Sequence, residues 1–154
     1  MPTIEFFSPP NGDFVINPDM AWLKNLVLKE GPEYWNAGAG QASIKYDKGK
    51  RSPQLLIIFE KSLGFFLEYI DAKSVYYVSL GKGDFAHAVT VHICGEPLLL
   101  PSTFFIPRRL AWIAVEEFCR AGLRHRKVRW GKRSEQHWAY GHPEDGNGKG
   151  GRQE

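Results

Sequence analysis

Few residues in this chain have types and spacing that could do chemistry. The segment His142-Pro143-Glu144 matches the H-x-E half of a zinc deaminase signature, in which histidine ligates zinc and glutamate moves protons. The other half, P-C-x-x-C, does not follow it, because both cysteines of the chain, Cys94 and Cys119, come earlier. The match therefore predicts no zinc site.

Two further patterns resemble binding motifs by spacing alone. His92 and Cys94 stand at i and i+2 of an expected strand and share one face, but no second pair at metal-ligand spacing accompanies them. We expect His92 to be structural. Gly146, Gly148 and Gly151 fit G-x-G-x-x-G, yet no strand precedes them and no helix follows, so they predict no phosphate site. The sequence predicts neither a metal nor a cofactor.

A catalytic nucleophile is equally unsupported. Cys119 falls in the middle of an expected helix, toward its apolar side, away from the cationic or helix-N-terminal settings that activate thiols. Serine, histidine and aspartate all occur, but no nucleophile-elbow sequence does. We therefore predict that the protein is not an enzyme and that it acts through its surface.

A basic cluster, Arg120–Arg133, is the strongest charge feature. Its basic members are Arg120, Arg124, His125, Arg126, Lys127, Arg129, Lys132 and Arg133. Trp130 and Trp138 lie nearby, and interleaved basic and aromatic residues can hold a phosphate backbone and stack bases. The cluster also suits a solvated helix end and edge strand. A third interpretation is a docking patch for an acidic protein surface.

Two helices are expected around a series of strands. The first begins near Asn17 as a cap, with Pro18 and Asp19 in its first turn, and ends before Gly31-Pro32. Its apolar face consists of Trp22, Leu23, Leu26 and Val27. The second helix follows Pro107, and Gly122 is its expected C-terminal cap.

Alternating or continuous apolar residues predict strands near 42–46, 55–59, 65–70, 75–80, 88–93 and 128–130. Short turns connect them, which favours antiparallel pairing. We predict an α+β fold: a curved, mainly antiparallel sheet of about five to six strands with two main helices packed on one face. Residues 1–140 are expected to form a single domain, with 1–16 as an irregular arm, and residues 141–154 a mobile, Gly-rich tail.

The bulk properties fit one globular domain. The chain has 154 residues, with 20 basic against 17 acidic residues and a net charge of +3, too small an imbalance to imply nucleic acid by itself. The start, Met1 to Glu5, has no basic region or long apolar stretch, and no apolar run approaches the roughly 20 residues that span a bilayer. We therefore expect the protein to lie in the cytoplasm and not in a membrane. Its two cysteines are expected to be buried free thiols.

Several segments together resemble a known family. They are the early helix with Trp22-Leu23, the strand from Gly64 to Ile70, Tyr77-Val78-Ser79-Leu80-Gly81, Phe105-Ile106-Pro107, Ala114-Val115-Glu116-Glu117-Phe118 before Gly122, and Val128-Arg129-Trp130. Over residues 18–131, this pattern is similar to the first-numbered family of immunity proteins from bacterial polymorphic-toxin and contact-dependent inhibition systems.

The resemblance implies a cytoplasmic protein that binds and neutralises a cognate toxin domain, in this family often a deaminase or nuclease. The family offers no catalytic residues to transfer. Inhibitors of nucleic-acid enzymes are often acidic because they mimic phosphate, whereas this chain is slightly basic. Any mimicry must therefore be local, and Glu60, Glu68, Asp71 and Asp84 are expected to supply it.

Our predicted contact patch lies on the strands and turns around positions 68–85. Its members are Glu68, Asp71, Tyr76, Lys82, Asp84 and Phe85. The basis is the density of turn and aromatic residues in a region without catalytic groups. The alternative function is a small nucleic-acid-binding module that uses the basic cluster.

Overall fold

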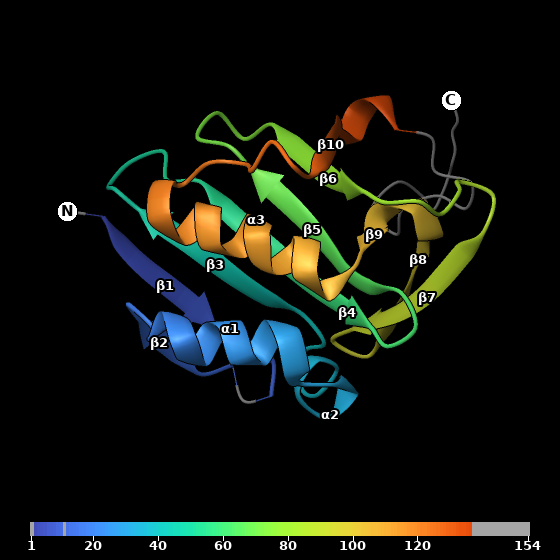
Figure 1. The fold of residues 1–154 in the computed structure, drawn as a ribbon, viewed down its shortest axis with the longest axis horizontal. Helices are drawn as coiled ribbons and strands as arrows, with labels where there is room; N and C mark the ends of the chain where they lie inside the picture. Colours follow the sequence, from blue (N-terminus) through green and yellow to red (C-terminus); the bar gives the residue numbers. More distant parts are fainter. Residues whose placement is uncertain (1, 11, 137–154) are drawn as a thin grey trace.

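The computed structural model describes residues 2–10 and 12–136, and the predicted tail at 141–154 lies outside them. An eight-stranded antiparallel sheet forms the centre (Figure 1). Its path runs β10 (Arg129–Lys132), β6 (Tyr76–Leu80), β5 (Gly64–Ile70), β4 (Gln54–Glu60), β3 (Ala42–Asp47), β1 (Thr3–Phe7) and β2 (Phe14–Ile16), and β9 (Phe105–Ile106) also pairs with β5. A separate hairpin joins β7 (Ala88–Ile93) to β8 (Glu96–Pro101).

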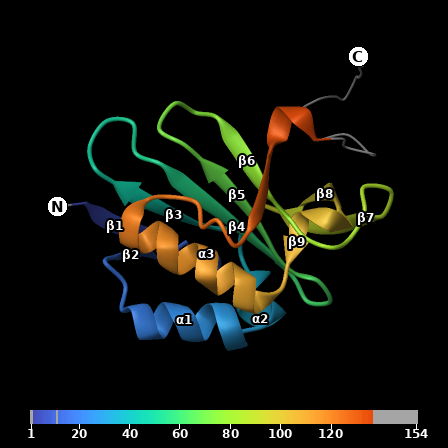
Figure 2. The same ribbon diagram turned by 45° about the horizontal axis from the view of Figure 1, so that its top comes forward.

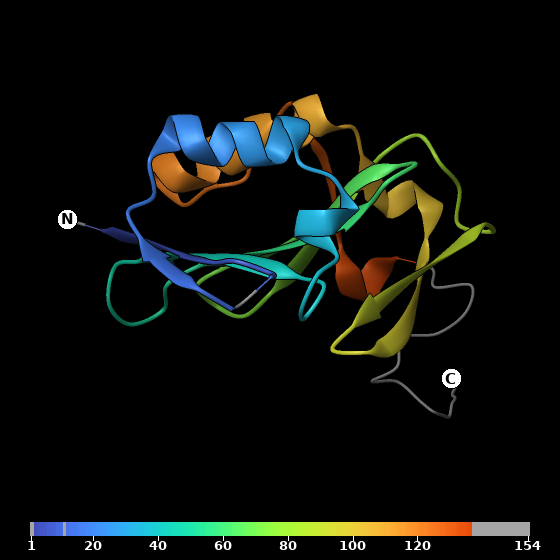
Figure 3. The same cartoon turned by 90° about the horizontal axis from the view of Figure 1, so that it is seen from below.

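The predicted α+β class is confirmed. The helices are α1 (Met20–Lys29), α2 (Pro32–Trp35) and α3 (Arg108–Ala121), with 3₁₀ turns η1 (Ser102–Phe104) and η2 (Arg133–Glu135). Both long helices, α1 and α3, lie on one face of the sheet, as Figure 3 shows. The predicted strand count was too low, since β1, β2, β8 and the two-residue β9 were not anticipated as strands.

The helices are held against the sheet by one apolar core. Leu23 and Val27 of α1 and Val115 and Phe118 of α3 are buried in it. Arg108 joins the helices because its guanidinium donates to the Val27 carbonyl oxygen at 3.0 Å. Gly122 ends α3 in the left-handed conformation, as predicted, with φ of 70°.

Residues 1–16 were predicted to be an irregular arm, but Thr3–Phe7 and Phe14–Ile16 are strands. β1 pairs with β3, and Phe6 is fully buried because the alternation of Ile4 and Phe6 directs both toward the helix-covered face. Asn17 does not cap α1: its side-chain oxygen accepts the Ile4 N–H at 2.9 Å. Asp19 is the cap and accepts the Trp22 N–H at 2.9 Å.

A second, smaller core lies on the opposite face of the sheet. The β7–β8 hairpin, at the end of the molecule away from the N-terminus in Figure 2, contributes Val91 and Leu100 to it. Its other buried members are Ile58, Phe66, Val78, Phe104 and Phe105. The sheet is thus covered on both faces at this end.

Ser79 joins β5, β6 and η1 through one buried hydroxyl. Its Oγ accepts the Leu67 N–H at 3.0 Å and donates to the Phe104 carbonyl oxygen at 2.7 Å. Ser79 itself has no exposed surface. Removing the hydroxyl therefore breaks two hydrogen bonds in the interior of the protein.

We predict that Ser79→Ala lowers the free energy of unfolding by about 2 kcal/mol or more, because it removes two buried hydrogen bonds at once. Urea denaturation measures this. Ser43→Ala on β3 is the matched control: the Ser43 hydroxyl makes no hydrogen bond within the described residues, so the change should stay within about 0.5 kcal/mol. Equal effects of the two substitutions would contradict this role of Ser79.

Candidate partner-binding cleft

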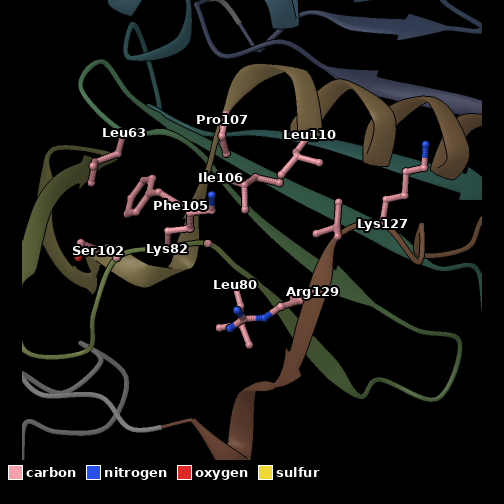
Figure 4. A pocket seen from close by; sticks show the side chains of 13 residues that line it. Leu63, Leu80, Lys82, Ser102, Phe105, Ile106, Pro107, Leu110, Lys127 and Arg129 are labelled. Carbon is pink, nitrogen blue, oxygen red and sulfur yellow. The ribbon is translucent and has the colours of Figure 1, made fainter.

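One cleft stands out where four parts of the chain meet. Its volume is about 440 Å³, within the roughly 300–1,000 Å³ range of ligand pockets. Figure 4 shows the side chains that surround it. They are Leu63 before β5, residues 80–83 at the end of β6, Ser102, Phe105–Pro107 and Leu110 around the start of α3, and residues 127–129 at the start of β10.

Two glycines allow the wall of this cleft to form. Gly64 has a φ of 108°, and a Cβ there would overlap the carbonyl oxygen of Ile106. A Cβ at Gly81 would overlap the carbonyl oxygen of Phe105. The β9 backbone therefore passes close to both glycines, and this fixes the path of the chain into α3.

The loop after β6 is tied to η1 by backbone and hydroxyl contacts. The Ser102 Oγ accepts the Asp84 N–H at 3.1 Å, and the Ser102 N–H donates to the His87 carbonyl oxygen at 2.7 Å. Gly81 N–H donates to the Thr103 carbonyl oxygen. These bonds hold the 81–83 segment in place before any partner arrives.

The rim of the cleft is cationic. Lys82, Lys127 and Arg129 are exposed, and their side chains make no ion pair or hydrogen bond within residues 2–10 and 12–136. The described lining contains no aspartate or glutamate. The first turn of α3 borders the cleft through Pro107 and Leu110, and it has neither a side-chain cap nor an acidic residue. An apolar floor is thus bordered by cations, of which Lys127 also lines a neighbouring pocket with Glu116 and Glu117.

Glu68, a predicted contact residue, is placed inside the protein. Its side chain is only 7% exposed, and its carboxylate accepts a hydrogen bond from the Arg133 guanidinium at 3.2 Å. That guanidinium also lies over the Tyr76 ring, 4.5 Å from its centroid. Glu68 therefore closes the sheet against η2, and it does not present a surface to a partner.

The other predicted contact residues fall into two groups at opposite ends of β6. Asp71 accepts the Lys73 and Val75 N–H groups at 2.8 and 2.9 Å and shapes the β5–β6 turn near Tyr76. Beyond the other end, Asp84 contacts the His87 ring nitrogen at 3.1 Å and accepts the His87 N–H at 2.7 Å, and the ring contact, followed by the backbone one, lowers the pKa of the Asp84 carboxyl.

The remaining two residues lie near Asp84. Phe85 packs edge-on against Phe104, with centroids 6.0 Å apart. Lys82 alone of the six lines the cleft.

The basic cluster divides into paired and unpaired members. Arg120 pairs with Glu117 at 2.6 Å, and Arg124 lies 3.7 Å over the Tyr77 ring. The exposed side chains of Arg126, Lys127, Arg129 and Lys132 make no such contact within the described part of the chain. Trp138 lies outside that part.

Sequence reasoning missed the cleft as a site because its walls come from distant segments. A signal was nevertheless present. Gly64, Gly81, Phe105-Ile106-Pro107 and Val128-Arg129 all belong to the segments that carry the family resemblance, and each contributes to the cleft or its wall.

The two cysteines differ in environment. Cys119 is buried, as predicted, and burial, together with the negative charge of Glu116, raises the pKa of its thiol to about 12. Cys94 is exposed, so the prediction of a buried thiol was wrong there. With Gly95 it forms the two-residue β7–β8 turn, and both have positive φ, 52° and 82°, as a type I′ hairpin turn requires.

His92 is exposed on β7, and no group of three metal-ligating side chains occurs within residues 2–10 and 12–136.

We expect Ellman's reagent at pH 8 to label one thiol of the native protein quickly, because a thiol with a pKa near 12 is thiolate in only about one molecule in ten thousand at that pH. The second thiol should react on unfolding in guanidinium. Cys94→Ser is the control and should abolish the fast phase. Two fast equivalents in the native protein would contradict the burial of Cys119.

A second exposed apolar feature lies far from the cleft. The rings of Phe7 and Phe14 lie tilted against each other with centroids 4.6 Å apart, and Phe7, Phe14 and Ile16 are 42%, 46% and 55% exposed on the β1–β2 hairpin. Apolar surface of this kind is a feature of interaction sites. The cleft is the better-defined site, because it combines apolar surface with three cations that have no partner among the described residues.

Comparison of the chain with models of known protein families finds no match, and no curated protein is significantly similar to it in sequence. Within the part of the chain that the structure describes, each helix is too short or too polar to cross a membrane.

Proposed function

We propose that this protein is an immunity protein that binds and neutralises a cognate bacterial toxin by occluding its active site or substrate surface. The observation that carries the proposal is the cleft. It combines an apolar floor with an unpaired cationic rim, and part of its lining, Leu80-Gly81, Phe105–Pro107 and Val128-Arg129, belongs to the segments that resemble immunity proteins. We further propose that the toxin acts on nucleic acid, as a deaminase or a nuclease, and that this protein binds it in the cytoplasm.

The packing of the cleft supports tight binding. Its walls are fixed by the glycine contacts of β9 and by the hydrogen bonds of Ser102, so little ordering is needed when a partner docks. Hot spots in protein interfaces are buried apolar anchors surrounded by a polar rim. A high-affinity complex of this kind buries about 1,600 Å² in total, so the cleft would be the centre of a larger contact surface.

Co-expression tests the proposal. The toxin domain encoded next to this protein is expressed from an inducible promoter in cells with and without this chain. We expect toxin alone to reduce viable counts by several orders of magnitude and co-expression to restore growth. A catalytically inactive toxin is the control for expression burden. Equal killing with and without this protein would refute the proposal.

A nucleic-acid-binding module is the alternative function. The unpaired side chains of Arg126, Lys127, Arg129 and Lys132 favour it, whereas the internal contacts of Arg120, Arg124 and Arg133 reduce the charge that the basic cluster can offer.

This alternative predicts a gel shift with single-stranded DNA or RNA at 50 mM salt, with an affinity that falls steeply by 200 mM salt as counterions are released. The absence of any shift at 50 mM would remove it.

A further inference from the structure

We propose that the cleft binds an acidic segment of the toxin that carries a large apolar side chain at its centre. This inference rests on the proposed function and names the chemistry of the toxin surface that the protein contacts. It follows from three features of the structure: the apolar floor of the cleft, the charge of its rim, and the internal pairing of the acidic residues.

The floor of the cleft suits an apolar anchor. Leu63, Leu80 and Leu110 offer exposed or partly exposed apolar surface to it, next to the buried Ile106 and Val128. Leu63 is 37% exposed, so part of this apolar surface remains available to a partner. Burying such surface yields about 25 cal/mol per Å², and this favours an apolar side chain over a polar one.

The rim of the cleft requires an anion. Lys82 comes from the loop after β6, whereas Lys127 and Arg129 come from the segment leading into β10. All three lack a partner among the described residues. The uncapped N-terminus of α3 adds the positive end of a fourteen-residue helix at the same place. A carboxylate-bearing segment would satisfy these charges.

A protein ligand fits this cleft better than a nucleic acid. Proteins that bind single strands stack the bases on exposed aromatic rings. The only aromatic side chain in the lining is Phe105, and it is 4% exposed. The remaining floor is aliphatic, which complements an apolar side chain and offers no stacking platform.

The four acidic residues expected to imitate phosphate all make contacts within the fold. Glu60 accepts the Ser62 N–H at 2.8 Å, and Glu68 pairs with Arg133. Asp71 and Asp84 accept backbone N–H groups of their own turns. All four acids expected to imitate phosphate are therefore engaged within the fold. The unpaired charge around the cleft is cationic, because Lys82, Lys127 and Arg129 lack a partner among the described residues and the lining contains no acidic residue, so we infer that the cleft contacts an acidic surface of the toxin.

Paired charge reversals test the inference. The double variant Lys127→Glu/Arg129→Glu changes the rim, and Lys48→Glu/Lys50→Glu makes the same change of charge on the exposed β3–β4 turn, away from the cleft. Binding of each purified variant to a catalytically inactive form of the toxin encoded next to this protein is measured by calorimetry at 50 and 200 mM salt.

We expect the rim variant to bind the toxin at least about 100-fold more weakly than the wild type, because its reversed charges face the acidic surface of the toxin. The affinity of the turn variant should stay within about threefold of the wild-type affinity, because its reversed charges lie away from the cleft. Circular dichroism checks that both variants fold. If the rim reversal does not fold, Lys127→Gln/Arg129→Gln replaces it and should weaken binding about tenfold. Leu63→Asp should also weaken binding, because it places a carboxylate on the apolar floor.

The outcomes separate the two proposals. If the wild type protects cells and the rim variants bind as well as the turn variant, the inference is overturned and the proposed function stands. If the rim variants bind the toxin normally but lose a gel shift with single-stranded RNA, the cations serve nucleic acid and the inference is overturned. If the wild type does not bind the toxin, both proposals fail.

Discussion

The rest of the structure depends on the close approach of β9 to two glycines. Gly64 and Gly81 leave room for the carbonyl oxygens of Ile106 and Phe105, and Ser79 fixes the adjoining Phe104 carbonyl. This contact directs Ile106 into the helix-side core and Phe105 into the core under the β7–β8 hairpin. It also sets where α3 begins. The two cores, the helix layer and the wall of the cleft thus share one backbone constraint.

The distribution of charge within this frame is the second organising feature. The chain has nearly equal numbers of basic and acidic residues, with a net charge of +3, yet the charges at the cleft are all positive. Asp71 shapes a turn and Glu68 pairs with Arg133 of η2, while Lys127 and Arg129 at the cleft remain unpaired within the described residues. A nearly neutral protein thereby presents a local cationic rim. Complementary charges mainly steer encounter and select partners, and apolar contact at the centre supplies affinity.

Much of the fold could be predicted from local pattern, whereas the site could not. The helical spacing of apolar residues between Pro107 and Gly122 predicted α3, and runs of apolar residues predicted β4 to β6. The β1–β2 hairpin was not predicted, because its strands are short and the prolines and glycine of the turn between them usually break regular elements. Glu68 looked like a surface residue because its partner, Arg133, lies 65 residues away. The cleft needs contacts between segments that no local pattern connects, and the glycines that permit those contacts resemble ordinary turn residues.

The most direct measurement is amide hydrogen exchange of this protein, alone and bound to the inactive toxin. If the cleft is the centre of the interface, exchange should slow in the segments 80–83, 102–110 and 127–129, which lie far apart in sequence and together line the cleft. The β3–β4 turn should exchange equally in both states. Slowed exchange confined to the β1–β2 hairpin, with these three segments unchanged, would contradict the assignment of the cleft as the binding site.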